Sequence, residues 1–139
     1  MENKTHRYSA SILEEYIDFL GHVHHANYLV LFEQARWDWI TKNGYGLNKI
    51  LATKIGPVIL ELDIRYRKEL RARQEISIES QVTSHHKLFT DIRQVMKNQE
   101  GILCSEIQLK FGCFNLETRK LIAPPLEWLQ ALDIINADQ

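Results

Sequence analysis

One segment, residues 27–43, constrains the fold of this chain most strongly. Plotted at 100° per residue, its apolar side chains cover nearly the whole circumference and leave one narrow polar strip of Gln34, Asp38 and Thr41. Because a helix with so little polar surface must be mostly buried, we expect it inside the domain. Roughly 16 residues at 1.5 Å each give a length of roughly 24 Å, about the width of five strands spaced ~4.8 Å apart. Asn43-Gly44 supplies its C-terminal stop.

The predicted helix has two distinct apolar faces. One stripe is assigned to the sheet and contains Tyr28, Leu31, Phe32, Ala35 and Trp39. Val30 and Trp37 lie on nearly the opposite side, where a lone domain would expose them. We therefore expect cover from a partner subunit or from the C-terminal segment around Leu126, Trp128 and Leu129.

Elsewhere the apolar residues alternate with polar ones, which is typical of strands. The pattern predicts a short opening strand at 8–12 and, after Pro57, four further strands at 58–67, 75–82, 88–96 and 103–115. The strand at 58–67 is expected to have one face in the core. A short closing helix is expected at 126–135, after Pro124-Pro125. Short turns between successive strands require antiparallel pairing, so the predicted class is α+β, in the order β-α-β-β-β-β.

Length and charge exclude several kinds of protein. The 139 residues fit one domain, 1–139, and the net charge of −1 disfavours nucleic acid as a partner. No apolar run approaches the ~20 residues of a membrane span, and the N-terminus lacks the apolar core of a signal peptide. We expect a cytoplasmic protein whose two cysteines, Cys104 and Cys113, are small core residues.

The stretch that leads into the predicted helix carries a recognisable motif. In order, it contains Asp18, Gly21-His22-Val23, His25, Asn27-Tyr28 and Phe32-Glu33-Gln34-Ala35-Arg36. This pattern resembles the hotdog-fold acyl-CoA thioesterases of the 4-hydroxybenzoyl-CoA thioesterase family, and the resemblance spans nearly the whole chain. It implies a hotdog fold, in which a sheet of about five strands wraps around one long helix. Tyr16 and Leu88 depart from the pattern common in that family, and these departures concern the substrate.

Thioester hydrolysis needs a base or nucleophile on one side of the carbonyl and hydrogen-bond donors where negative charge develops. Asp18 suits the first task, as general base on water or as direct nucleophile, and the first amides of a helix suit the second. The resemblance assigns the oxyanion contact to the amide of His25, whose imidazole is expected to orient water or substrate. Further substrate-binding residues are expected at Gly21, His22, Asn27, Tyr28 and Lys87.

The resemblance also implies partners. The substrate would be an acyl-CoA or acyl-carrier-protein thioester, and no cofactor is expected. Hotdog domains pair their sheets edge to edge, which implies a homodimer with acyl sites at the interface. A homotetramer built from such dimers is the alternative. Basic residues for the CoA phosphates are available in two groups, Arg65 to Arg73 and His85 to Lys87.

Several alternatives stay open from the residues alone. His22, His24 and His25 could be metal ligands, but the nearby ligand set is poor and we expect no metal. Glu33 could be a second acid, although an ion pair with Arg36 at i+3 is the favoured interpretation. The alternative functions are a non-catalytic acyl-CoA-binding module, a hotdog dehydratase or an acyl-transfer step in a biosynthetic pathway.

Overall fold

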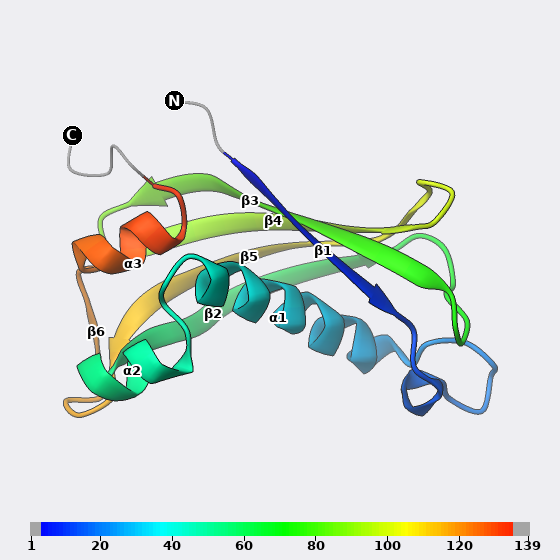
Figure 1. Ribbon diagram of the computed structural model, residues 1–139, viewed down its shortest axis with the longest axis horizontal. Helices are drawn as coiled ribbons and strands as arrows, with labels where there is room; N and C mark the ends of the chain where they lie inside the picture. Colours follow the sequence, from blue (N-terminus) through cyan, green and yellow to red (C-terminus); the bar gives the residue numbers. More distant parts are fainter. Residues whose placement is uncertain (1–3, 135–139) are drawn as a thin grey trace.

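The computed structural model describes residues 4–134 as a strongly curved antiparallel sheet and a long helix (Figure 1). The chain begins with strand β1 and the one-turn 3-10 helix η1, and continues into the long helix α1 and the short helix α2. Strands β2 to β6 and a short helix, α3, follow. The bounds are β1 Thr5–Ser11, η1 Glu14–Tyr16, α1 His25–Lys42, α2 Leu47–Thr53, β2 Ile55–Tyr66, β3 Glu75–His86, β4 Phe89–Asn98, β5 Leu103–Asn115, β6 Lys120–Ile122 and α3 Leu126–Ala131.

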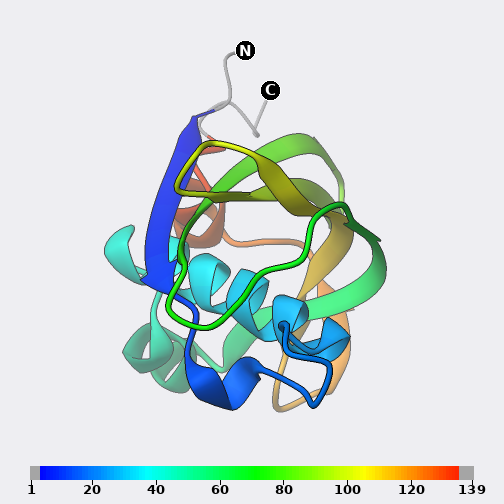
Figure 2. The same cartoon turned by 90° about the vertical axis from the view of Figure 1, so that its right-hand side faces the viewer.

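The sheet has six strands, and the order along its main path is β1-β3-β4-β5-β2. All pairings are antiparallel, and the short strand β6 pairs with the end of β5. Viewed along its length, the sheet curves around α1, which lies in the hollow (Figure 2). The predicted α+β class and antiparallel connections are confirmed, with one more strand than the five expected.

The predicted inner stripe of α1 forms the centre of the core. Its buried members are Tyr28, Leu31, Phe32, Ala35 and Trp39, and Ile40 is buried with them. At the far end of the helix, the Trp128 ring packs edge-on against Tyr45 and Phe111 at centroid distances of 5.0 and 5.9 Å. Cys104 and Cys113 are buried free thiols, as expected.

The helix boundaries differ slightly from the prediction. α1 starts at His25, two residues early, because His24 acts as its N-cap with its side chain. At the C-terminal end, Gly44 has a φ of +93°, the left-handed conformation that glycine adopts at low cost. α2 was not predicted, because its seven residues carry too little periodicity. The closing helix ends at Ala131, and residue 135 lies outside the described residues.

The prediction for β2 is wrong in part. The alternation in 58–67 puts Leu60, Leu62 and Tyr66 on the predicted core face, but each is exposed. β2 is an edge strand, and its pairing with β5 shifts register between Ile59 and Glu61, which disrupts the alternation. One long border of the sheet is therefore apolar and unpaired within the described chain.

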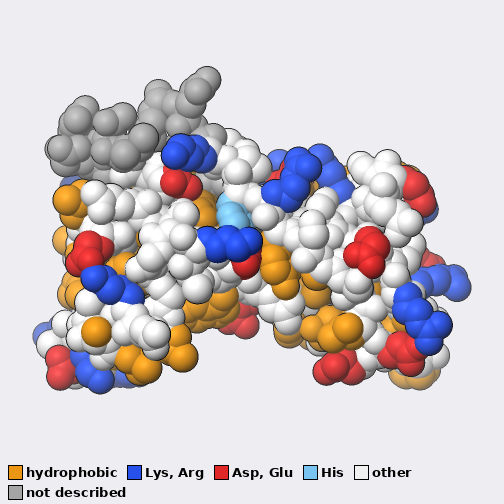
Figure 3. Space-filling view, viewed as in Figure 1, with side chains coloured by type: hydrophobic (Ala, Val, Ile, Leu, Met, Phe, Trp, Pro, Cys, Tyr) orange, Lys and Arg blue, Asp and Glu red, His pale blue; other side chains and the backbone are white. Residues whose placement is uncertain are grey.

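The outer face of α1 is also open. Val30 and Trp37 are 39% and 38% exposed, so the C-terminal segment does not cover them fully. Figure 3 shows apolar side chains reaching the surface on the helical side of the molecule. None of the helices in the described part is long and apolar enough to cross a membrane.

Candidate active site

A tight loop between η1 and α1 presents Asp18. Its backbone closes on itself, since the Asp18 N–H donates to the His22 carbonyl and the Gly21 N–H donates to the Asp18 carbonyl, both at 3.0 Å. Gly21 has a φ of +91°, which explains the glycine at this turn. The Leu20 N–H donates to Asp18 Oδ1 at 2.8 Å, so the carboxylate is oriented by its own loop.

At the N-terminus of α1, all but one of the first backbone amides have a hydrogen-bond acceptor within the described chain. The first N–H groups of a helix have no partner within it. Here the His24 N–H donates to the Tyr16 carbonyl at 2.9 Å, the Ala26 N–H to His24 Nδ1 at 3.2 Å and the Asn27 N–H to the His24 carbonyl at 2.9 Å. Within the described chain, the His25 N–H is left without an acceptor. A single free donor therefore stands at the positive end of the helix dipole.

Both features border one open cleft. It contains about 710 Å³ of empty space, including solvent at its mouth, and Asp18, His22, His25 and Tyr28 are among the residues that line it. The opposite wall is the end of β2 and the loop that follows, with Tyr66, Arg67, Lys68 and Glu69. The structure thus brings four of the predicted site residues together and adds a wall that includes two cations.

Tyr66 is a site residue that the sequence analysis missed. Its hydroxyl donates to the His25 carbonyl at 2.9 Å, and its ring packs edge-on against Tyr28 at a centroid distance of 5.1 Å. Burial raises the pKa of Tyr66, and burial raises the pKa of Tyr28 to about 12, so both phenols stay protonated near neutral pH. The position of Tyr66 at the end of a strand gave no indication of this contact.

Three other predicted residues do not line the cleft. Gly21 forms the turn behind Asp18, and Asn27 Nδ2 donates to the Tyr16 carbonyl at 3.1 Å, which pins the start of α1. Lys87 was expected to bind substrate, but within one chain it is remote from the cleft. It sits in the turn between β3 and β4, whereas the Asp18 loop lies near the start of β3, at the other end of the sheet (Figure 1).

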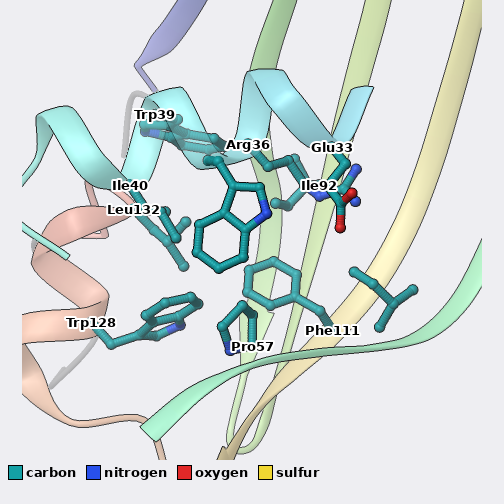
Figure 4. Close-up of a pocket in the computed structure, with 11 residues that line it drawn as sticks. Glu33, Arg36, Trp39, Ile40, Pro57, Ile92, Phe111, Trp128 and Leu132 are labelled. Carbon is teal, nitrogen blue, oxygen red and sulfur yellow. The ribbon is translucent and has the colours of Figure 1, made fainter. Parts of the chain in front are cut away.

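The predicted ion pair between Glu33 and Arg36 does not form in the described chain. Arg36 Nη1 donates instead to Gln94 Oε1 at 2.9 Å, and burial lowers the pKa of Arg36. Glu33 and Arg36 both border a second, largely apolar pocket between α1 and the sheet, walled by Pro57, Ile92, Phe111, Trp128 and Leu132 (Figure 4). Gln94, a buried residue of β4, makes the contact with the guanidinium that the sequence analysis assigned to Glu33. The position of Gln94 in the fold could not be predicted from the spacing of residues along the helix.

The histidines of the loop make local contacts. His24 Nδ1 caps the helix, His22 Nδ1 lies 3.2 Å from the Val23 carbonyl oxygen, and the His24 and His25 rings are 4.3 Å apart. No group of three or more potential metal-binding side chains occurs among residues 4–134. The absence of a metal requirement remains a prediction.

Comparison with known proteins identifies the family. The family model described as the Thioesterase-like superfamily matches residues 13–132, which is most of the chain. The chain belongs to the Thioesterase-like superfamily. The match is to the superfamily, so the narrower 4-hydroxybenzoyl-CoA thioesterase family stays a prediction.

Two curated enzymes that act on acyl-CoA thioesters are similar in sequence over most of the chain. The long-chain acyl-CoA thioesterase FadM of Escherichia coli K12 is 28% identical over 109 residues, which cover 78% of this chain and 82% of FadM. The acyl-CoA thioester hydrolase YbgC of Escherichia coli O6:H1 is 22% identical over 115 residues, which cover 83% and 86%.

Solved structures of a probable thioesterase and of a CoA-binding protein share the fold. The probable thioesterase YbaW of Escherichia coli is 25% identical with a TM-score of 0.79, covering 93% of this chain and 97% of YbaW. A Staphylococcus aureus protein solved in complex with CoA is 19% identical with a TM-score of 0.88, covering 100% of this chain and 88% of that chain. The hotdog fold expected from the motif is confirmed.

Proposed function

We propose that this chain is an acyl-CoA thioesterase, which hydrolyses an acyl-CoA thioester to a free acid and CoA. The observation that carries the proposal is one cleft bordered by a loop-held carboxylate, Asp18, and by the only unbonded first-turn amide of α1 in the described chain, that of His25. Membership of the superfamily and the similarity to FadM and YbgC support the same chemistry.

The proposed reaction divides between these two groups. The His25 N–H donates to the thioester oxygen and stabilises the negative charge that develops as the carbonyl is attacked. As a base, Asp18 takes a proton from the attacking water, and this proton passes to the sulfur as the C–S bond breaks, so CoA leaves as the thiol. As a nucleophile, Asp18 displaces the CoA thiolate and forms a mixed anhydride, which water then hydrolyses to the free acid and the regenerated carboxylate, while the thiolate takes up a proton from water. The His25 side chain lines the same cleft, and in this proposal its imidazole orients water or the substrate. No cofactor takes part in this proposal.

We propose that the cations on the cleft wall contact the CoA phosphates. Arg67 and Lys68 border the cleft. Arg67 Nε also donates a hydrogen bond to Glu106 Oε2 at 3.1 Å. Guanidinium and ammonium groups suit phosphate oxygens. Lys87 lies too far from this cleft in the same chain, so its contribution would have to come from a second copy.

We propose that the enzyme is a homodimer built on the edge of β2. An unpaired strand edge with exposed Ile59, Leu60 and Leu62 is a template for pairing with another strand. Antiparallel pairing of two β2 strands about a two-fold axis places the Tyr66 end of one strand near the Pro57 end of the other. The cleft of one subunit would then face the apolar pocket of its partner, and a tetramer could form from two such dimers.

A cytoplasmic location also belongs to the proposal. The buried free thiols of Cys104 and Cys113 fit a reducing compartment.

A panel of acyl-CoAs with detection of the released thiol tests the proposal. The panel contains short, long and aromatic acyl groups, because the sequence does not specify the acyl group of the substrate. Each acyl group is also tested as a thioester of an acyl carrier protein, to compare the two thiol carriers. We expect turnover of at least one acyl-CoA above the uncatalysed rate. Tight binding of acyl-CoA without thiol release would instead support a non-catalytic binding module, and release of water from a β-hydroxyacyl-CoA would support a dehydratase.

A further inference from the structure

Tyr66 lies between the sheet edge and the first turn of α1, and the proposed reaction has not used it. It is the last residue of β2 and is separated by 41 positions from His25, whose carbonyl accepts its hydroxyl proton at 2.9 Å. The Tyr66 and Tyr28 rings pack edge-on, which limits the directions in which the hydroxyl can point. The hydrogen bond therefore connects the first residue of α1 to the last residue of β2.

The contact concerns the residue whose N–H has no acceptor within the described chain. The His25 N–H shares a peptide group with the His24 carbonyl, which accepts from the Asn27 N–H at 2.9 Å. The His25 carbonyl belongs to the next peptide group, and Tyr66 holds that group against the end of β2. Helix ends can fray, and fraying of the first turn would change the direction of the His25 N–H. Tyr66 therefore ties the turn that carries this donor to the sheet.

Resting on the proposed function, we infer that Tyr66 is a positioning residue of the hydrolysis. It keeps the His25 N–H aimed at the thioester oxygen, and it acts through the backbone of His25. A donor stabilises developing charge well only when its direction is fixed before the reaction, because reorienting it during the reaction costs part of the gain. Loss of the Tyr66 hydroxyl should therefore lower kcat and leave the binding of substrate nearly unchanged.

The first variant is Tyr66→Phe, which keeps the ring on Tyr28 and removes only the hydroxyl. We expect kcat to fall about 10-fold and KM to change less than about 2-fold. Tyr45→Phe is the matched control, since the Tyr45 hydroxyl also donates to a backbone carbonyl, that of Ile55 at 3.1 Å, at the other end of α1. Tyr45→Phe should lower the unfolding midpoint as much as Tyr66→Phe or more, and should keep the wild-type kcat.

A second pair of variants isolates the amide. His25→Ala removes the imidazole and keeps the N–H, whereas His25→Pro removes both. Proline is tolerated at the first position of a helix, and the preceding residue, His24, has φ −62° and ψ 139°, which proline favours before it. We expect His25→Pro to be about 100-fold slower than His25→Ala. Single-turnover reactions with enzyme in excess keep such slow variants measurable.

Combining Tyr66→Phe with each of the two His25 variants tests whether Tyr66 acts through the His25 amide. If Tyr66 acts through the amide, Tyr66→Phe costs about 10-fold in the His25→Ala enzyme and less than about 2-fold in the His25→Pro enzyme. An equal loss in both backgrounds, or a wild-type kcat for Tyr66→Phe itself, would overturn the positioning role. Equal rates for His25→Ala and His25→Pro would instead overturn the oxyanion role of the amide, which belongs to the proposed function.

Discussion

Gln94 of β4 joins the sheet to Arg36 of α1 by accepting a hydrogen bond from Nη1 at 2.9 Å. The same amide donates from Nε2 to the Phe32 carbonyl at 3.1 Å and to Ser80 Oγ at 2.9 Å. Gln94 is fully buried, and in the described chain it is the hydrogen-bond partner of the Arg36 guanidinium and the Ser80 hydroxyl in the core. A buried polar network of this kind stabilises only while every member is satisfied.

Replacing Gln94 by leucine should therefore be costly. The Arg36 guanidinium and the Ser80 hydroxyl would each lose a partner in the core, and an unsatisfied buried group costs about 1–3 kcal/mol. We expect Gln94→Leu to lower the free energy of unfolding by roughly 2 kcal/mol or more, measured by urea denaturation. Gln108→Leu on β5 is the control, because Gln108 is exposed, and it should change stability by less than about 0.5 kcal/mol. Equal effects of the two changes would show that the network contributes little.

Much of the fold could be predicted from the sequence because two periodicities dominate it. The inner stripe of α1 follows directly from helical spacing, and three of the strands follow from alternation. The failures have a common cause in tertiary context. The middle of β2 is exposed because β2 is an edge strand whose pairing with β5 shifts register. Arg36 hydrogen-bonds to Gln94, 58 positions away, instead of forming an ion pair with Glu33.

The candidate site divides in the same way. Asp18, His22, His25 and Tyr28 are close in sequence, so a motif could place them in one cleft. Tyr66 comes from a distant strand, and only the pairing of β2 with β5 brings its hydroxyl to His25. Lys87 was included for its charge alone, and the length of β3 separates it from the loop.

The dimer proposal predicts a response to a charge on the outer face of α1. Trp37 is 38% exposed beside the apolar pocket that the partner subunit would face. We expect Trp37→Glu to shift the enzyme toward monomer in sedimentation velocity and to lower its activity, because burying a carboxylate in an interface is unfavourable. Leu13→Glu is the control, since Leu13 is 46% exposed and follows β1, the strand at the opposite edge of the sheet from β2. A dimeric, fully active Trp37→Glu enzyme would contradict the assignment of this face to the interface.

Removal of metal should leave the reaction intact. In the loop, His24 Nδ1 is occupied as a helix cap, and the proposed chemistry uses a carboxylate and a backbone amide. After dialysis against a chelator, we expect kcat to stay within about 2-fold of the untreated enzyme. Activity lost on dialysis and restored by one added divalent metal would reinstate His22, His24 and His25 as ligands.

The Asp18→Asn enzyme provides the most direct measurement of the central claim. Asparagine keeps an oxygen for the Leu20 N–H, so the loop and the unfolding midpoint should be preserved, while the base or nucleophile is lost. Glu100→Gln, an exposed carboxylate in the turn between β4 and β5, is the matched control and should retain the wild-type rate. With the best acyl-CoA of the panel, we predict a kcat for Asp18→Asn at least ~100-fold below wild type. A folded Asp18→Asn enzyme with near-wild-type turnover would contradict the account.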